Sequence, residues 1–460
     1  MKRDEHQPAA RSLCVDVVEA GGRARRGCRP CEIGADLTFS TSHLESYCLA
    51  QWEPVIFDAL VVAAAVEFCD RIQRRQTQHW GRNIELRVPV HDPERWSAPA
   101  VSAALKGALD FLTGDCWALS FIARKSPAYV PQQFAFEMPG DARAVIPFSE
   151  GLDSRAVAGL MHRELGDGLI RVRLGTKEFL PVVEPSGKKQ PFTSIPYRVK
   201  PKTGEFVESS ARSRGFKFAT ISGIAAYMVK AERIIVTESG QGSIGPVLVA
   251  VGQGYEDYRS YPLFTDRMET FLNALFGHRV RFDFPRLWNT KGETLAAFAN
   301  ECADGASWST TWSCWQQNRH SSVAGHKRQC GICAACMLRR LSVHAAGLTE
   351  AKETYVWENL SASTFEGGAS ADFERITKAQ REYAIAGALH LDHLATLQKS
   401  PINKGTIDLT VAQLSRSRGV PEDTIRASMN RLLNQHESEW MNFLDALGPD
   451  SFVANWVARS

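Results

Sequence analysis

An apolar run, a loop of small residues and a helix follow one another directly between Arg143 and Leu165. Residues 144–148 are typical of a buried strand, and apolar residues recur at helical spacing from Val157 to Leu165. The unpaired amide groups at the start of such a helix, together with the helix dipole, form a site for an anion in the preceding loop. The stretch therefore predicts an α/β fold in which an open parallel sheet binds a ligand at the carboxyl ends of its strands.

The loop has the sequence Ser149-Glu150-Gly151-Leu152-Asp153-Ser154. Its two serine hydroxyls can donate hydrogen bonds to phosphate oxygens, and Asp153 can cap the helix or hold a metal ion bound to phosphate. The loop lacks the Gly-Lys-Ser/Thr ending of the common nucleotide loop, and an ordinary strand-to-helix turn has similar residues. Of these two interpretations, phosphate binding by residues 149–154 is the more specific one.

The loop resembles the Ser-Gly-Gly-x-Asp-Ser loop of the PP-loop ATP pyrophosphatases, which release pyrophosphate from ATP and leave a substrate adenylated. The resemblance implies an adenine nucleotide alpha-hydrolase-like fold, with ATP as a cofactor and Mg²⁺ bound through Asp153. Glu150 stands where that family has its first Gly. A Gly there permits a left-handed backbone and a close approach of phosphate, whereas Glu adds a negative charge. The Glu150 side chain therefore turns away, helps to hold a metal ion, or weakens nucleotide binding.

A chain of 460 residues is too long for a single core. We expect a poorly ordered basic N-terminus over residues 1–35, an accessory α+β domain over 36–140, a nucleotide-binding domain over 141–300, a zinc-binding segment over 301–348 and a helical C-terminal domain over 349–460. In the accessory domain, hydrophobic periodicity predicts helices near residues 59–75 and 96–112 and strands near 84–90 and 117–122.

Further strands and helices are expected after the loop helix. A strand is predicted over 169–174, a third over 191–199, a helix over 213–229 and a fourth strand over 234–237, which brings Glu238 to a strand end. Arg214 at the start of that helix and Lys291 further along are candidate charge stabilisers during catalysis. Solvated surface charge is the plainer interpretation of both side chains.

The net charge and the cysteine content of the chain limit its expected ligands and its expected cellular compartment. A formal net charge of +3 points to no particular polyanionic partner, so nucleic acid is not an expected ligand. No signal-peptide pattern or membrane span is visible, and we therefore predict a cytoplasmic protein. In that compartment the cysteines should be thiols or metal ligands rather than disulfides, and Cys28 and Cys31 are expected to be free thiols.

Four cysteines follow a metal-binding pattern. Cys314 precedes the sequence Cys330-Gly331-Ile332-Cys333-Ala334-Ala335-Cys336, which has three thiols at two-residue intervals around a Gly. Four thiolates suit tetrahedral zinc and leave no open position, so such a zinc ion would be structural. A [4Fe–4S] cluster also takes four cysteines, and unliganded structural cysteines are the remaining alternative.

The loop and the cysteine pattern together are similar to the 7-cyano-7-deazaguanine synthases of queuosine biosynthesis. The similarity rests on the loop, on a distal cysteine and on Cys-Gly-x-Cys-x-x-Cys-x-x-Arg ending at Arg339, and it covers about residues 143–345. It implies structural zinc and adenylation of 7-carboxy-7-deazaguanine with ATP and Mg²⁺, followed by attack of ammonia. Arg214 and the Tyr261-Pro262 pair fall where that family has comparable residues.

The two extensions are longer than such a synthase requires. Extended relatives occur in antiviral defence operons, where the same activation is thought to join a deazaguanine to a protein amine, and the chain most resembles the synthase-like component of the Qat system. The resemblance implies a protein partner or protein substrate encoded nearby. Open alternatives are a binding protein impaired by Glu150, an ordinary nitrile synthase, and a tRNA-thiolating enzyme. Residues 411–431 resemble a helix-turn-helix, although a packing or partner domain is favoured.

Overall fold

The computed structural model describes residues 12–40, 52–76, 81–129, 142–174, 192–251, 256–316, 321–373 and 375–458. The chain divides into two compact units, each built from separate stretches of sequence. The first unit contains residues 1–147, 167–235 and 264–283, and the second contains residues 148–166, 236–263 and 284–460. Within the described ranges, no helix combines the length and the apolar composition needed to cross a membrane.

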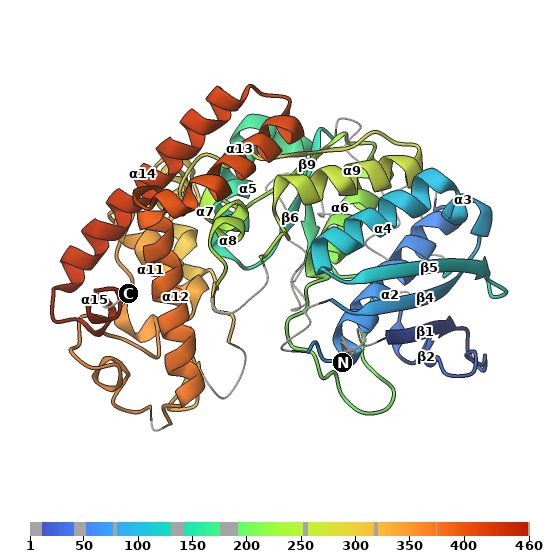
Figure 1. The fold of residues 1–460 in the computed structure, drawn as a ribbon, viewed down its shortest axis with the longest axis horizontal. Coiled ribbons are helices and arrows are strands. Elements are labelled where there is room, and N and C mark those ends of the chain that lie inside the picture. The colour runs from blue at the N-terminus through green and yellow to red at the C-terminus, as the bar shows by residue number, and fades with distance from the viewer. Residues whose placement is uncertain are drawn as a thin grey trace, which may run out of the picture. The chain divides into compact units, whose positions relative to one another are not determined.

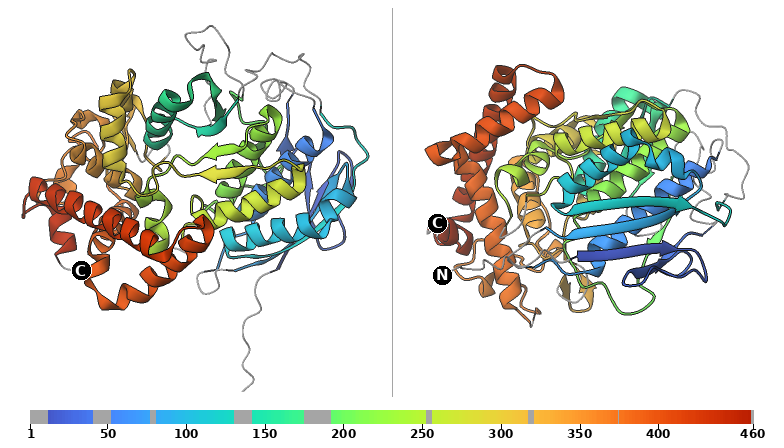
Figure 2. Two further views of the ribbon diagram at one scale, coloured as in Figure 1. Left: turned by 90° about the horizontal axis from the view of Figure 1, so that it is seen from above. Right: turned by 45° about the vertical axis from the view of Figure 1, so that its right-hand side comes forward.

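The first unit contains a four-stranded parallel sheet in the order β2 (Arg29–Glu32), β1 (Ser12–Val18), β4 (Asn83–Val90) and β5 (Cys116–Ala123) (Figures 1 and 2). Apolar residues alternate along β4 and are buried, as the sequence pattern predicts. Helix α2 (Pro54–Ile72) packs against β4 and buries nearly all of its residues. The predicted helix over 96–112 is divided at Ala98 into α3 (Pro93–Ser97) and α4 (Pro99–Thr113), because Pro99 starts a new helix.

Residues 12–35 are ordered, and the expectation of a poorly ordered segment is wrong for them. Strand β1 pairs with β2 and with β4, which ties this region to a distant part of the sequence. Cys14 and Cys28 form a disulfide, so the predictions of free thiols at Cys28 and of a chain without disulfides are also wrong. Cys31 is a buried free thiol, as expected. Residues 21–27, whose Gly- and Arg-rich composition suggests disorder, belong to the connection between two parallel strands.

A second sheet in the first unit has the order β10 (Arg281–Asp283), β9 (Arg233–Ile235), β6 (Ala144–Phe148) and β7 (Leu169–Arg173). Strand β9 runs parallel to both β6 and β10. Helix α6 (Arg214–Val229) forms where the sequence predicts a helix, and helix α9 spans Pro262–Phe276. The strand expected over 191–199 is wrong: only β8 (Arg198–Val199) forms, and it pairs with β3 (Leu37–Thr38) in a separate ribbon.

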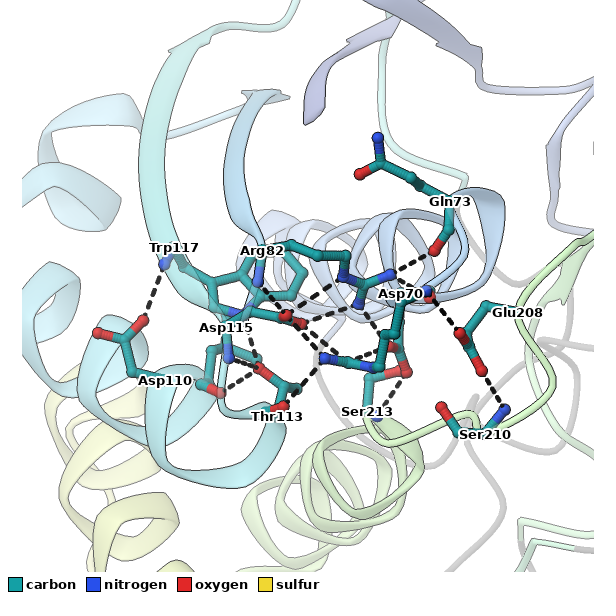
Figure 3. A network of polar contacts seen from close by, with 12 residues as sticks. Asp70, Gln73, Arg82, Asp110, Thr113, Asp115, Trp117, Glu208, Ser210 and Ser213 are labelled. Atoms are coloured by element: carbon teal, nitrogen blue, oxygen red, sulfur yellow. Dashed lines mark hydrogen bonds and ion pairs between the residues drawn. The ribbon is translucent and has the colours of Figure 1, made fainter. Parts of the chain in front are cut away.

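Two arginines and two aspartates form a buried ion-pair network in the first unit (Figure 3). Arg75 and Arg82 each pair with both Asp70 and Asp115, at 2.7 to 2.9 Å. Asp70 also accepts a hydrogen bond from the backbone N–H of Ser213, immediately before α6. The pKa of Asp70 is lowered because the two guanidinium groups and this amide outweigh the cost of burial. The network therefore joins the end of α2, the start of β4 and the start of α6.

The second unit contains helices α5 (Leu152–Leu165), α7 (Gly240–Ser243), α8 (Gly245–Leu248), α10 (Lys291–Glu301), α11 (Ala334–Ala345), α12 (Lys378–Thr396), α13 (Lys404–Arg418), α14 (Glu422–Leu447) and α15 (Phe452–Val457). A helical C-terminal region is therefore confirmed. Helix α14 packs against α11, α12 and α13, and the indole of Trp440 is fully buried among them. Gly419 ends α13 in a left-handed conformation, which permits the turn into α14. The predicted domain boundaries remain a prediction.

Candidate functional site

The loop between β6 and α5 is closed by its own two serines. The Oγ atoms of Ser149 and Ser154 lie 2.9 Å apart, and Ser154 Oγ accepts a hydrogen bond from the backbone N–H of Ser149 at 3.1 Å. Gly151 precedes the first residue of α5 and has extended backbone angles. The predicted strand, loop and helix thus follow one another as expected. Leu152 is buried at the start of α5 and packs into an apolar cluster with Phe298 and Trp308, which fixes the helix.

Glu150 occupies the loop without a left-handed backbone. Gly151 has a φ of −72°, and Glu150 does not occur among the residues with positive φ. The backbone carbonyl of Glu150 accepts a hydrogen bond from the N–H of Trp312 at 2.8 Å. The conformational freedom of Gly is therefore not needed at position 150 in this loop, and the charge and the volume of the Glu150 side chain are its remaining differences from the PP-loop pattern.

Lys291 and Asp153 form an ion pair beside the loop. The Nζ atom of Lys291 lies 2.5 Å from Oδ2 of Asp153, and both side chains are largely buried. Asp153 lies in the first turn of α5, and Lys291 is the first residue of α10. Thr290 and Glu293 form a capping box that fixes this end of α10: the Thr290 hydroxyl accepts from the N–H of Glu293, and the Glu293 carboxylate accepts from the N–H of Thr290.

A second carboxylate, that of Glu238 in the segment that follows β9, interacts electrostatically with this pair. Burial raises the pKa of Glu238 to about 7, and the negative charge of Asp153 adds to the effect, while Lys291 and Arg259 oppose it. A Cβ atom at Gly242 would lie 2.4 Å from Glu238 Oε2, so a larger residue there would displace this carboxylate. The sequence places Glu238 at a strand end, on the side of the sheet where the loop is expected, but it does not show that Glu238 interacts with Asp153 and Lys291.

Arg214 belongs to the first unit and Tyr261 to the second. Arg214 is the first residue of α6 in the first unit, where its guanidinium group lies 4.9 Å from the ring centre of Phe218. Tyr261 is buried in the second unit, and its hydroxyl donates to Oε1 of Gln413 on α13 at 2.9 Å. The structure therefore brings Lys291 to Asp153, whereas the predicted catalytic role of Arg214 remains a prediction.

The four predicted cysteines come together in the second unit. The Sγ atoms of Cys314, Cys330, Cys333 and Cys336 lie within 4.8 Å of one another, and all four residues are buried. Cys333 caps α11 and Cys336 lies in its first turn, where the helix dipole favours thiolates. His326 is exposed on β12 (His326–Lys327) and does not belong to the group, and His320 lies outside the described residues.

The cysteine group fits one tetrahedral metal ion. Zinc–sulfur bonds of about 2.3 Å place the sulfurs of a tetrahedron roughly 3.8 Å apart, and Cys330 Sγ and Cys336 Sγ are separated by 3.8 Å. Backbone N–H groups of Cys330 and Cys333 donate to the sulfurs of Cys314 and Cys330, as expected around metal-bound thiolates. Gly331 has a φ of +83°, and a Cβ atom there would lie 3.0 Å from the carbonyl oxygen of Trp357. The Gly of the motif is thus required by the tight turn.

A family model matches part of the chain. Residues 234–347 match the family model of the queuosine biosynthesis protein QueC. No curated protein matches the chain. The matched range includes Glu238, Lys291 and the four cysteines, whereas the loop at residues 149–154 lies before it. The chain is therefore an α/β protein with a PP-loop type nucleotide-binding fold, and a quarter of its length is similar to a family of 7-cyano-7-deazaguanine synthases.

Proposed function

We propose that this protein adenylates a carboxylate with ATP and then transfers the acyl group to an amine. The observation that carries the proposal is the Asp153–Lys291 pair at the start of α5, next to a loop of the PP-loop type. The similarity of residues 234–347 to QueC supports 7-carboxy-7-deazaguanine as the carboxylate. Ammonia or a protein amine is the acceptor, and a defence role like that of the Qat component follows from the resemblance of the extended chain.

The loop residues would bind the leaving pyrophosphate. Backbone amides of residues 152–154 would donate to its oxygens, at the positive end of the α5 dipole. The hydroxyls of Ser149 and Ser154, which bond to each other in the loop, would turn toward the pyrophosphate when it binds. A carboxylate oxygen of the substrate attacks the α-phosphorus of ATP, the bond to the β-phosphate oxygen breaks, and pyrophosphate leaves. The Lys291 ammonium group would offset the negative charge that develops on that leaving oxygen. Magnesium, when bound through Asp153, would neutralise further phosphate charge.

The second half-reaction takes place at the activated carboxyl carbon. The amine nitrogen attacks this carbon, the carbon–oxygen bond to AMP breaks, and an amide forms while the amine gives up a proton. Glu238, whose pKa of about 7 allows it to take up a proton near neutrality, is suited to act as the base. The four cysteines would hold a zinc ion that stabilises the fold and takes no part in these steps.

Pyrophosphate release tests the proposal. The native protein, Asp153→Ala and Lys291→Met would each be assayed with ATP and magnesium, with and without 7-carboxy-7-deazaguanine. Release that requires both the deazaguanine and Asp153 is the expected result, and mass spectrometry of the products would then identify the acceptor. Release that is independent of the deazaguanine would contradict the substrate assignment. Equal release by Asp153→Ala would contradict the assignment of the loop.

A further inference from the structure

Helix α14, which belongs to the C-terminal region beyond the QueC-like segment, contacts the end of α10 that carries Lys291. Four polar residues of α14 recur at helical spacing and face this end: Arg431, Gln435, His436 and Glu439. His436 and Glu439 are buried, which is costly for such side chains unless they are hydrogen-bonded. Each makes a specific contact with the residues around Lys291.

The first contact runs through Gln241 of α7. The backbone N–H of Lys291 donates to Gln241 Oε1 at 2.7 Å, and the Gln241 amide nitrogen lies 2.7 Å from His436 Nδ1. His436 Nε2 lies 2.9 Å from the carbonyl oxygen of Leu391. Because a carbonyl only accepts, Nε2 must carry the proton and Nδ1 must accept from Gln241. The hydrogen bonds therefore run in one direction from Lys291 to α12, with a neutral His436 between them.

The second contact reaches the residue that caps α10. The hydroxyl of Thr290 donates to Glu439 Oε1 at 2.5 Å, and the side-chain amide of Gln435 donates to the same oxygen at 3.1 Å. Arg431 reaches the other half of the capping box, since its guanidinium group pairs with Glu293 and donates to the carbonyl of Trp288 at 2.6 Å. Both halves of the capping box are thus held by α14.

The packing leaves little room for this end of α10 to move. A Cβ atom added at Gly292 would lie 2.8 Å from Ala345 Cβ and 3.1 Å from Glu439 Oε1. A Cβ atom at Gly240 would lie 2.4 Å from a methyl group of Leu432 on α14. Gly292 therefore permits the close approach of α11 and α14 to α10, and Gly240 permits that of Leu432 and of the Leu287 carbonyl to α7.

We propose that α14 is a positioning element of the active site: through Gln241, Thr290 and Glu293 it fixes the first turn of α10 and so holds Lys291 against Asp153. This inference rests on the proposed function, in which Lys291 acts on the leaving pyrophosphate. The C-terminal region is then part of the catalytic unit, and residues of α14 act on the reaction without touching the substrate. His436 is the central positioning residue, because it connects α14 to the Lys291 backbone through a single side chain.

Substitutions at His436 can show whether this residue positions Lys291 for catalysis or only stabilises the fold. His436→Leu removes both hydrogen bonds, whereas His436→Asn keeps an acceptor near the place of Nδ1 and gives up the bond to Leu391. We expect His436→Leu to lower kcat for pyrophosphate release about tenfold or more with little change in KM for ATP, and His436→Asn to recover most of that loss. A role in folding alone predicts that both variants fail alike.

Two partly exposed arginines of α14 provide a second test, which remains possible if His436→Leu does not fold. Arg431 is half-exposed and contacts the capping box, and Arg426 is similarly exposed but pairs with Asp408 on α13. Arg431→Met should lower kcat several-fold and Arg426→Met should leave it unchanged. Glu437→Ala provides a further control, since Glu437 lies next to His436 and pairs with Lys399.

Chemical labelling of Lys291 gives a readout that does not depend on catalysis. The full-length protein would be treated briefly with acetic anhydride, and the modified lysines counted by peptide mass spectrometry against the exposed Lys404 as reference. We expect Lys291 to react slowly in the native protein and about fivefold faster in His436→Leu and Arg431→Met, because its turn opens more often. Unchanged labelling in both folded variants would overturn the positioning role. Faster labelling in variants of a protein that never releases pyrophosphate would support positioning and refute the proposed adenylation.

Discussion

The ammonium group of Lys291 lies 2.5 Å from a carboxylate oxygen of Asp153, although the two residues are 138 positions apart in the chain. The pair joins the first turns of two helices, α5 and α10, and so defines one side of the loop at residues 149–154. A largely buried lysine at this position is a point charge that, in the proposed reaction, can follow a moving phosphate.

Lys291→Met should abolish most activity. Because the lysine charge is assigned to the leaving pyrophosphate, kcat for pyrophosphate release should fall about 100-fold or more. Loss of one partner also leaves Asp153 unpaired, so the double variant Asp153→Asn/Lys291→Met should unfold at a higher temperature than Lys291→Met alone. Activity is measured by pyrophosphate release and stability by thermal unfolding. A single variant with native activity would exclude Lys291 from the reaction.

Substitution of Glu150 tests whether the protein is an enzyme or a binding protein that has lost turnover. Since the backbone at position 150 is not left-handed, Glu150→Gly should remove the charge and the side chain while the loop keeps its conformation, and KM for ATP should fall by up to about tenfold with kcat unchanged. Glu150→Gln is the matched control, because it removes the charge and keeps the side chain. Activity that appears only in Glu150→Gly would instead support a binding protein that has lost turnover.

The metal prediction is tested at Cys336. The purified protein should contain about one zinc ion per chain, and Cys336→Ser should lose most of it because three thiolates bind zinc less tightly than four. Its melting temperature should fall as well. Cys302→Ser is a suitable control, since Cys302 is a free cysteine outside the four-sulfur group. If the purified protein contained a stoichiometric amount of iron instead, the four cysteines would hold an iron–sulfur cluster and the zinc prediction would be wrong.

Glu439 should make the stability of the protein depend on pH. Burial raises the pKa of Glu439 to about 7 from an ordinary value of 4.5, and the charge of Glu293 adds to this while Arg431 opposes it. The folded protein therefore keeps a proton that the unfolded chain releases, so this contribution is complete below pH 4.5 and is lost as the pH rises through 7. The loss is roughly 3 kcal/mol at most. The free energies of unfolding of the native protein and of Glu439→Gln, measured with denaturant, should differ increasingly as the pH rises from 4.5 to 7. The same pH dependence in both proteins would contradict the raised pKa of Glu439.

The buried network around Arg82 should be important for the stability of the first unit. Arg82→Leu leaves two buried aspartates with a single arginine, and we expect a loss of about 3 kcal/mol or more in the free energy of unfolding. Lys106 and Asp110 form an exposed pair on α4, so Lys106→Ala should change stability by less than about 1 kcal/mol. Urea unfolding followed by circular dichroism measures both. Equal effects would mean that the network contributes no more than a surface pair.

Local patterns in the sequence predicted the parts of the fold that depend on local interactions. The strand at residues 144–148, the helix after Leu152 and the strand at 169–173 occur where the apolar spacing indicates them. The four cysteines also come together as their spacing implies. Strands β1 and β2 were missed because their pairing with each other and with β4 is not encoded in the composition of residues 12–35.

The candidate site required long-range information. Lys291 could be named as a candidate from its charge, but its distance from Asp153 depends on how α10 packs. Glu238 carries no motif, and its raised pKa arises from burial and from neighbours that the sequence does not place together. The disulfide between Cys14 and Cys28 was missed for the same kind of reason, because the spacing of two cysteines does not show whether their chains approach.

The path from Lys291 through Gln241 to His436 also bears on how relatives of this protein can diverge. A change at residue 241 alters both the acceptor for the Lys291 amide and the donor to His436, so one substitution breaks two hydrogen bonds. Related chains should therefore replace Gln241 and His436 together or keep both, and Thr290 and Glu439 should behave in the same way. A C-terminal region taken from a distant relative would be compatible with this site only if those pairs were transferred as well.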